Sequence, residues 1–387
     1  MVTTIGLDVL RKALHARKHP GISGGSSLLS LARQGLPYLT SPGGRARPPI
    51  TIYWNVNSVC NLHCKMCDVG TFNEESNFYK NLRIDRKLHE ISLEKFKSVV
   101  DEVAEYRPTI AINGTEPMMY KPLGAVTEYA RSKGLEVAVT TGGYNLLERA
   151  EELAAAGLTR LNVSIDAAPD LHNYIRGRKD VFHRATSGIR LFYEAAKRRG
   201  YEPEIMICAT IMNINHAHLE EFYEAVKDLP AKQINFTHMN FVDPQMAMTH
   251  NLKWGKKYTA TVNCLSTEVQ PDLVDIDVLW DQIERVQKRG DARVHFMPMF
   301  TKDQLTTYYK KPLEFMGSVP CVSTWFIAQV MADGEVIPYT RCYHVPLGNI
   351  NEQPFLELWN GEKARAWRGD LRSNGRFPAC TRCDMVY

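Results

Sequence analysis

The chain has 387 residues, of which 44% are hydrophobic and 23% charged, and its formal net charge is +4. These values are ordinary for a globular protein with one large and one smaller domain, and they exclude a disordered or fibrous chain. The sequence holds no apolar run long enough to span a membrane, its charged amino terminus does not resemble a secretory signal, and its mild charge predicts no nucleic-acid partner. We therefore expect a cytoplasmic protein.

Residues 1–49 combine a short basic amphipathic segment with a loop rich in Gly, Ser and Pro. This composition predicts a surface arm. Leu10 and Leu14, with the Lys and Arg residues near them, would also suit peripheral contact with a membrane surface.

From residue 50 the chain alternates between apolar, β-branched runs and helical patterns. The predicted strands are 50–56, 109–113, 135–141, 160–166, 204–212 and 233–239. The predicted helices between them include 93–106, 123–134, 147–157 and 218–229. Strands this continuously apolar are covered on both faces, so residues 50–242 predict a parallel barrel or an open doubly wound sheet.

After residue 242 this rhythm breaks. Residues 243–320 predict a connecting region of helix and loop, with the clearest helix at 275–290. Residues 325–339 predict a β-hairpin, because Asp333-Gly334 is a strong turn signal between two apolar runs. We expect residues 321–387 to form a separate small module.

Nine cysteines stand out, three of them within residues 60–67 and four within residues 321–383. Only Cys208 and Cys264 lie outside these two groups. An odd number of cysteines in a large chain without an export signal argues against a disulfide framework. Clustered cysteines in a reducing compartment indicate a bound metal.

The first group has the spacing Cys60-x-x-x-Cys64-x-x-Cys67 and directly follows the first predicted strand. Three thiolates on one loop can hold three irons of a cubic iron–sulfur cluster and leave the fourth iron open to a ligand. The alternative is a zinc site with His63 as its fourth ligand.

This loop resembles that of the radical SAM enzymes, in which three cysteines after the first barrel strand hold a 4Fe–4S cluster chelated by S-adenosylmethionine (SAM). Met66 stands where the family commonly has an aromatic residue. The resemblance covers residues 50–240. It implies an α/β fold, a partial (β/α)6 TIM-like barrel, with SAM as a cofactor and a reducing partner such as flavodoxin or ferredoxin.

Residues at the ends of successive predicted strands also resemble the SAM contacts of this family. Gly114 to Pro117 is similar to its GGEP motif, with Thr115 in place of the second glycine. Each match is weak alone, and their value lies in their position, because parallel α/β proteins place active sites at the carboxyl ends of their strands. The residues that the resemblance assigns to SAM are Gly114, Thr115, Glu116, Pro117, Thr141, Ser164, Asp166, Arg176 and Asn213, the last together with Asn215.

The cysteines of the tail are Cys321, Cys342, Cys380 and Cys383. Four thiolates fit a fully ligated site, either iron–sulfur or zinc. With the hairpin turn, the Pro-Leu-Gly-Asn stretch at 346–349 and the Leu-Trp-Asn stretch at 358–360, the tail resembles the SPASM/Twitch extension of radical SAM enzymes. Because the sequence has no further cysteines after Cys383, we expect one auxiliary 4Fe–4S cluster, as in the Twitch form.

The resemblance implies reductive cleavage of SAM to a 5′-deoxyadenosyl radical, which takes a hydrogen atom from the substrate. We expect a small molecule such as a sugar, an aminocyclitol or a nucleoside, because residues 1–49 are too short and too rich in glycine for a leader-peptide-binding domain. An electron passed to the auxiliary cluster would make the reaction a dehydrogenation.

Several alternatives stay open. A peptide maturase or epimerase would use Cys208 or Cys264 as its hydrogen donor, although both fit buried packing positions. A lipid-modifying enzyme and, outside enzymes, a zinc-stabilised binding protein are the others. His238, at the end of the sixth strand, is the candidate acid–base residue. Further candidates for lining the pocket are Asn240, His250, Tyr339 and Arg341.

Overall fold

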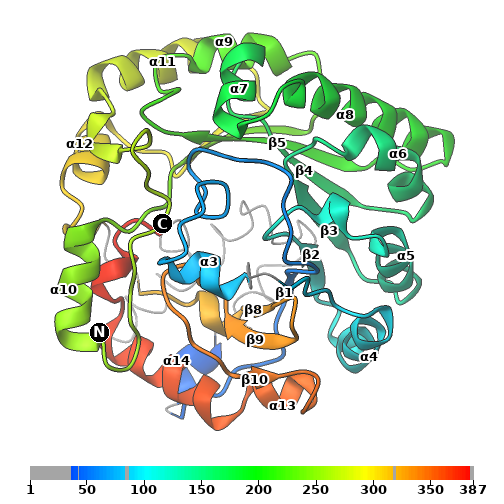
Figure 1. The fold of residues 1–387 in the computed structure, drawn as a ribbon, viewed down its shortest axis with the longest axis vertical. Helices are drawn as coiled ribbons and strands as arrows, with labels where there is room; N and C mark the ends of the chain where they lie inside the picture. Colours follow the sequence, from blue (N-terminus) through cyan, green and yellow to red (C-terminus); the bar gives the residue numbers. More distant parts are fainter. Residues whose placement is uncertain (1–35, 42, 83–86, 317–319, 384–387) are drawn as a thin grey trace.

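The computed structural model describes residues 36–41, 43–82, 87–316 and 320–383 (Figure 1), so most of the predicted arm at 1–49 lies outside the described residues. The strands are β1 (Thr51–Trp54), β2 (Thr109–Ile112), β3 (Val137–Thr141), β4 (Arg160–Ser164), β5 (Glu204–Ile211), β6 (Gln233–His238), β7 (Val294–Met297), β8 (Ile327–Val330), β9 (Glu335–Pro338) and β10 (Gly348–Asn349). The helices are α3 (Asn77–Asn81), α4 (Leu93–Val103), α5 (Leu123–Ser132), α6 (Leu146–Ala155), α7 (Pro169–Arg176), α8 (Val181–Arg198), α9 (Leu219–Val226), α10 (Pro244–Trp254), α11 (Ile276–Lys288), α12 (Lys302–Lys310), α13 (Phe355–Trp359) and α14 (Glu362–Asn374).

All these strands belong to one sheet with the order β10-β9-β8-β1-β2-β3-β4-β5-β6-β7. From β1 to β7 each strand pairs in parallel with the next one along the chain. The sheet does not close, since β7 and β10 are its two ends. The predicted α/β fold, a partial TIM-like barrel, is confirmed, and each of the six predicted strands is present.

Strand β7 lies in the region predicted to hold only helices and loops, and that prediction was wrong for these residues. The strand adds to β6 in parallel, with Phe296 opposite Phe236, and the two rings stack with their centroids 4.6 Å apart. The helix predicted at 275–290 is present as α11.

The predicted hairpin is also present, with β8 and β9 antiparallel on either side of Asp333-Gly334. However, β8 pairs in parallel with β1 as well, with Gln329 opposite Tyr53. Near this junction the rings of Tyr53 and Tyr339 stack with their centroids 4.3 Å apart. The tail hairpin therefore continues the main sheet and does not form a sheet of its own.

The helix α4 shows how these sequences form helices that pack against the sheet. In α4, Ser92 precedes the first turn and its hydroxyl accepts a hydrogen bond from the backbone N–H of Lys95. The same helix buries Phe96, Val99, Val100 and Val103 on one side. Figure 1 shows α4, α5, α6 and α8 along the outside of the sheet, which leaves the loops at the carboxyl ends of the strands to form the site.

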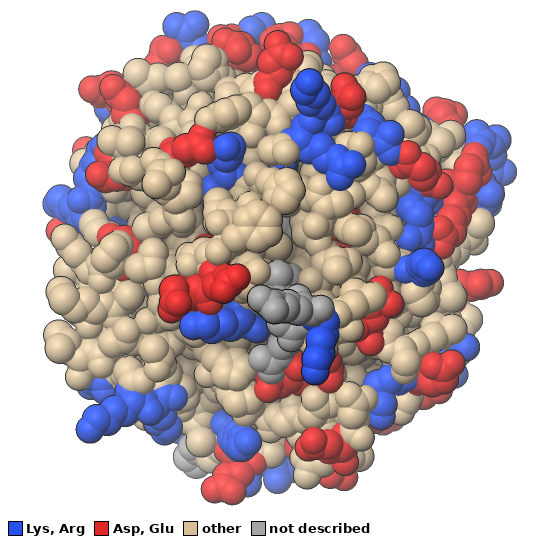
Figure 2. Space-filling view, viewed as in Figure 1, with Lys and Arg blue, Asp and Glu red and all other residues tan. Residues whose placement is uncertain are grey.

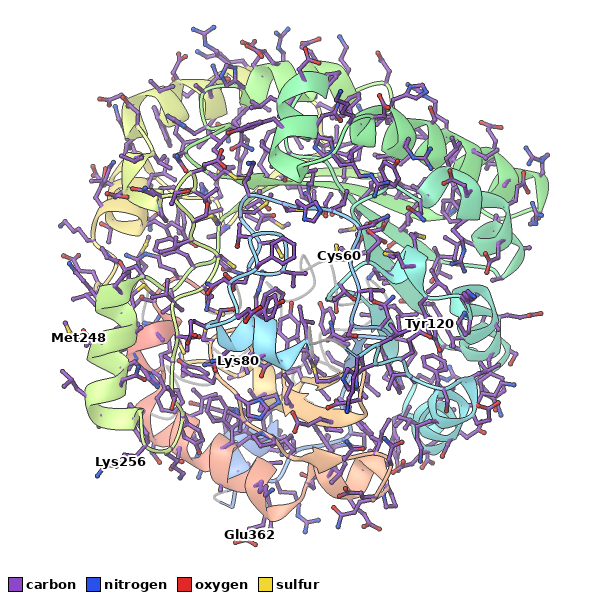
Figure 3. All side chains as sticks on the ribbon, in the orientation of Figure 1. Cys60, Lys80, Tyr120, Met248, Lys256 and Glu362 are labelled. Carbon is purple, nitrogen blue, oxygen red and sulfur yellow. The ribbon has the colours of Figure 1, made fainter. Side chains whose placement is uncertain are left out.

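On the face drawn in Figure 2, basic and acidic side chains are mixed around the rim. Figure 3 shows Cys60 inside the ring of elements and Met248, Lys256 and Glu362 at its outer edge. Within the part of the chain that is described, no helix is both long enough and apolar enough to cross a membrane.

Candidate functional site

The loop after β1 carries Cys60, Cys64 and Cys67 and is tied to the end of α7. The backbone N–H groups of His63 and Lys65 donate to the carbonyls of Arg176 (3.1 Å) and Ile175 (2.9 Å). Burial raises the pKa of the Cys60 thiol, and the nearby Cys64, Glu116 and Cys67 raise it further. The three thiols thus lie close enough to influence one another.

The chemistry of these donors fits an iron–sulfur cluster. The described residues hold no group of three Cys, His, Asp or Glu side chains gathered tightly enough for a single metal ion, so the fit rests on the kind of donor, which is thiol throughout. His63, the fourth ligand that the zinc alternative needs, packs its ring against Phe72 with centroids 5.5 Å apart.

Glu116 is buried beside this loop and holds the next strand end together. Its carboxylate accepts hydrogen bonds from the backbone N–H groups of Met118 (3.0 Å) and Gly142 (2.9 Å) and from the Thr141 hydroxyl (2.7 Å). Burial raises the pKa of Glu116, while these hydrogen bonds and Arg176 oppose that rise. The structure therefore brings together Glu116 and Thr141, two of the residues assigned to SAM.

The rest of the Gly114–Pro117 turn has a clear structural role. Gly114 has a φ of +103°, and a Cβ added to it would lie 1.2 Å from the Asn55 side-chain nitrogen. The Thr115 hydroxyl donates to the carbonyl of Asn57 (2.8 Å), and Pro117 begins a short 3-10 turn at Pro117–Met119. The turn is thus fastened to the segment that leads into Cys60.

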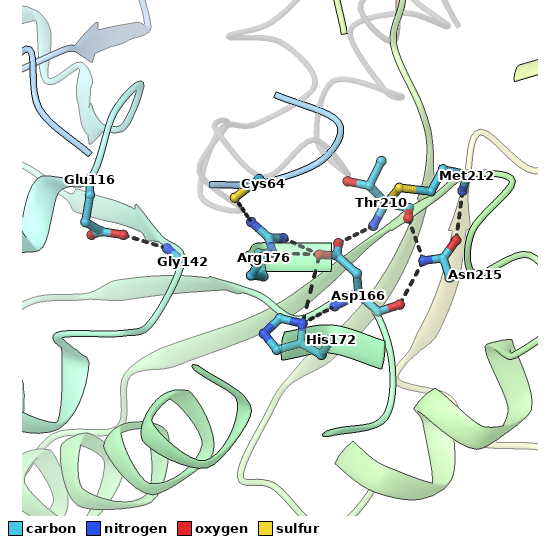
Figure 4. A network of polar contacts seen from close by, with 9 residues as sticks. All are labelled: Cys64, Glu116, Gly142, Asp166, His172, Arg176, Thr210, Met212 and Asn215. Carbon is cyan, nitrogen blue, oxygen red and sulfur yellow. Dashed lines mark hydrogen bonds and ion pairs between the residues drawn. The ribbon is translucent and has the colours of Figure 1, made fainter. Parts of the chain in front are cut away.

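A second network joins Asp166, after β4, to Arg176 at the end of α7 (Figure 4). Arg176 donates to one carboxylate oxygen of Asp166 through Nε (2.7 Å) and Nη2 (2.6 Å), and its Nη1 lies 3.7 Å from the Cys64 sulfur. The other carboxylate oxygen accepts from the backbone N–H of Thr210 (3.0 Å). This ion pair fixes a buried positive charge beside the cysteine loop.

Asn215, in the loop after β5, connects the same network by hydrogen bonds. Its amide donates to the carbonyls of Asp166 (2.8 Å) and Thr210 (2.9 Å), and its oxygen accepts from the Met212 N–H (2.8 Å). Asn213 instead fastens the loop after α10, because its side chain bonds the backbone of Glu268 and Gln270 (2.9 and 3.0 Å).

Ser164 and Cys208 face each other across β4 and β5. Burial raises the pKa of Cys208 to about 11, against a hydrogen bond from Asn235 that lowers it. The thiol is therefore protonated at neutral pH. The charge of Asp166 also raises the pKa of Cys208 and that of Arg176 lowers it, so the thiol lies near their network.

His238 lies in an aromatic cluster. Its Nδ1 is 2.8 Å from the Tyr309 hydroxyl, and its ring packs against Phe300, Tyr308 and Tyr309. Burial lowers the pKa of His238 to about 3, so the ring is neutral at physiological pH. This environment suits packing, and the acid–base role stays a prediction.

Three of the four tail cysteines lie around Tyr343. The hydroxyl of Tyr343 lies 3.2 Å from the Cys380 sulfur, and Cys380, Cys342 and Cys383 all raise the pKa of Tyr343, after burial. Cys321 in turn raises the pKa of Cys380, after burial, so it lies near that thiol. Sequence reasoning missed Tyr343, which follows Cys342 but carries no motif of its own.

Cys264 lies between the two cysteine groups. It has a φ of +59°, uncommon outside glycine, and its N–H donates to Asp68 (3.0 Å), the residue after Cys67. Cys264 also raises the pKa of Cys342 in the tail, after burial, so the two thiols lie near each other. Asp68 has no motif that could have marked it.

Comparison with protein families identifies the family to which these cysteine sites belong. Residues 54–229 match the radical SAM superfamily, and residues 321–384 match the iron-sulfur cluster-binding domain known as SPASM. The chain is a radical SAM enzyme. It binds SAM at a 4Fe–4S cluster and carries an auxiliary iron–sulfur domain in its tail.

Three known proteins resemble this chain along most of its length. An AdoMet-dependent heme synthase from Methanosarcina barkeri is 25% identical over 346 residues, which cover 86% of this chain and 88% of the relative. An Fe-coproporphyrin III synthase from the same organism is 24% identical over 336 residues, 81% of this chain and 74% of the relative. The crystal structure of Streptococcus suis SuiB bound to S-adenosylmethionine superposes with a TM-score of 0.57 at 15% identity, over 86% of this chain and 70% of SuiB, which shows a shared fold.

Proposed function

We propose that this radical SAM enzyme takes a hydrogen atom from a carboxylate-bearing tetrapyrrole and oxidises it by two electrons. The observation that supports this substrate class is the alignment with two tetrapyrrole synthases over 86% and 81% of the chain. The preference for a sugar, an aminocyclitol or a nucleoside, which rested on the sequence, draws no support from these relatives.

In this proposal Cys60, Cys64 and Cys67 hold the SAM-binding cluster. Glu116 accepts from the SAM amino group while its bonds to Thr141 and Gly142 keep the carboxylate in place, and Arg176 presents a fixed positive charge near the loop. When bound, the cluster and SAM supply the reductive cleavage that yields methionine and a 5′-deoxyadenosyl radical, with electrons from a partner such as flavodoxin or ferredoxin. Burial of Glu116 and Asp166 keeps water away from that chemistry.

Cys321, Cys342, Cys380 and Cys383 hold the auxiliary cluster in this proposal, with Tyr343 as a hydrogen-bond donor to Cys380. Full ligation by protein thiolates suits a one-electron acceptor, which makes the net reaction an oxidation. Cys264 is the alternative: as a hydrogen donor it would make the reaction redox-neutral.

The test begins with anaerobic purification and measurement of iron and sulfide. We expect about eight irons per chain, and about four in the Cys60/Cys64/Cys67→Ala triple variant. Cys208→Ala is the matched control, because it removes a buried thiol outside both groups and should keep all the iron. Absence of iron together with stoichiometric zinc would overturn the proposal.

The substrate is tested by reduced assays for 5′-deoxyadenosine. Coproporphyrin III should raise its formation, and the porphyrin product should have lost two hydrogens or a carboxyl group as carbon dioxide. Stimulation by a sugar, peptide or lipid and not by the porphyrin would replace the substrate class. Deuterium taken up from the solvent without net oxidation, and lost in Cys264→Ala, would favour the redox-neutral alternative.

A further inference from the structure

Arg341 follows β9 and directly precedes Cys342, and one of its polar atoms has no partner. Its Nε is buried and makes no hydrogen bond within the described residues. The guanidinium carbon lies over the Phe78 ring, 4.1 Å from its centre, so the side chain packs against an aromatic face. A guanidinium in this setting is positioned but not satisfied.

The groups that favour the charged form of this guanidinium, against its burial, come from separate segments of the chain. Those that raise its pKa are Cys264, Cys67, Tyr339 and Asp68. Asp68 already uses one oxygen to accept from the Cys264 N–H (3.0 Å) and the Asn73 amide (3.2 Å).

The other Asp68 oxygen, Oδ2, is buried and unpartnered like the Arg341 Nε. No ion pair joins these two residues in the part of the chain that is described. Asp68 therefore balances part of the charge of Arg341 without taking up its hydrogen-bonding capacity.

The position of Arg341 is between the two cysteine groups. Cys67 of the first group acts on its guanidinium, and its neighbour in the chain, Cys342, belongs to the second group. In the proposed function the substrate reacts beside the first group, and Arg341 lies near that group.

A buried guanidinium N–H without a partner is costly unless an acceptor binds it, and the planar fork of the group matches the paired oxygens of a carboxylate or phosphate. We propose that Arg341 binds a carboxylate or phosphate group of the substrate, so that the substrate is an anion. This inference rests on the proposed function for the place of the substrate, but not on its being a tetrapyrrole.

The test compares probes that differ only in the anionic group. Coproporphyrin III is paired with its methyl ester, and uridine monophosphate with uridine. Binding of each is measured by equilibrium titration to the anaerobic holoenzyme with SAM, for the wild type, Arg341→Gln and Arg341→Lys. Arg285→Gln is the control, because Arg285 is an exposed residue of α11 paired with Asp281.

We expect the wild type and Arg285→Gln to prefer one acid over its neutral partner, and Arg341→Gln to bind that acid about tenfold to a hundredfold more weakly. The neutral partners should bind all variants alike. Arg341→Lys should fall between, because it keeps the charge but loses the fork. A preference for the porphyrin acid identifies a carboxylate, and one for the nucleotide a phosphate.

The proposal is overturned if none of the probes binds the wild type, or if Arg341→Gln keeps the full acid preference. A change confined to the spectra or potentials of the clusters, restored by lysine, would also overturn it, since Arg341 would then serve only as their counter-charge. Should Arg341→Gln fail to load iron, Arg341→Lys gives the same comparison. Formation of 5′-deoxyadenosine without substrate is recorded in parallel, and its absence in the wild type counts against the proposed function instead.

Discussion

Replacing Gly114 with alanine should destabilise the protein because of one specific overlap. The added Cβ would lie 1.2 Å from the Asn55 side-chain nitrogen, so Asn55 would have to move. That amide donates to the carbonyl of Asn113 (3.1 Å) and accepts from Gln329 on β8, and both hydrogen bonds would be lost.

The expected size follows from a matched control. Gly134 also has a positive φ, +75°, but a Cβ there would meet nothing within 4 Å. Alanine at either position incurs about 1–3 kcal/mol of backbone strain and restricts the unfolded chain equally. Only Gly114→Ala also breaks two hydrogen bonds, so it should lower the free energy of unfolding by about 2–3 kcal/mol more than Gly134→Ala.

Urea unfolding followed by tryptophan fluorescence, under anaerobic conditions, measures this difference. The double variant Asn55→Ala/Gly114→Ala should be less destabilised than the sum of its single variants, because the overlap is absent without the Asn55 side chain. We also expect Gly114→Ala to lose iron, since Asn55 leads into the Cys60 loop. Equal unfolding midpoints for the two glycine variants would refute the reasoning.

Three further predictions concern the buried polar groups. Asp166→Asn leaves Arg176 buried and unpaired and should cost about 3–5 kcal/mol, whereas Asp166→Asn/Arg176→Met should cost less than the single variants together; additive thermal shifts would contradict this. Burial lowers the pKa of His238 from its usual 6.5 to about 3 in the folded protein, so between these pH values the unfolded state binds the extra proton. Stability should therefore fall as the pH drops from 6.5 toward 3, by up to about 1.4 kcal/mol per pH unit, and His238→Gln should flatten that slope in denaturation at stepped pH. Glu116→Ala leaves three donors without their acceptor and should weaken SAM binding about tenfold or more, which isothermal titration can measure.

The sequence located the strands whose apolar runs are buried, and it failed where burial is slight. Strand β7 has four residues, of which only Phe296 is buried, so it shows neither a continuous apolar run nor a clear alternation. The pairing of β8 with β1 joins segments far apart in the chain, and no local pattern encodes such a register.

The candidate site divides in the same way. Glu116 and Arg176 stand in recognisable motifs at strand and helix ends, so their types and positions were informative. The contacts of Asp68, Asn215 and Tyr343 depend on which loops meet in space. The missing hydrogen-bond partner of the Arg341 Nε is likewise a property of the packed molecule, and it cannot be predicted from composition or residue spacing.

The bond between β1 and β8 has a consequence for dissecting the molecule. A fragment that stops before residue 321 would strip β1 of a neighbour and expose a row of unpaired backbone N–H and C=O groups, a template for aggregation. The same ladder links the strand that leads into Cys60 with the hairpin that leads into Cys342. The tail therefore cannot simply be exchanged for that of another enzyme. In a chimera, the first strand of the new hairpin would have to pair with β1 as β8 does before either cysteine group could be held in place.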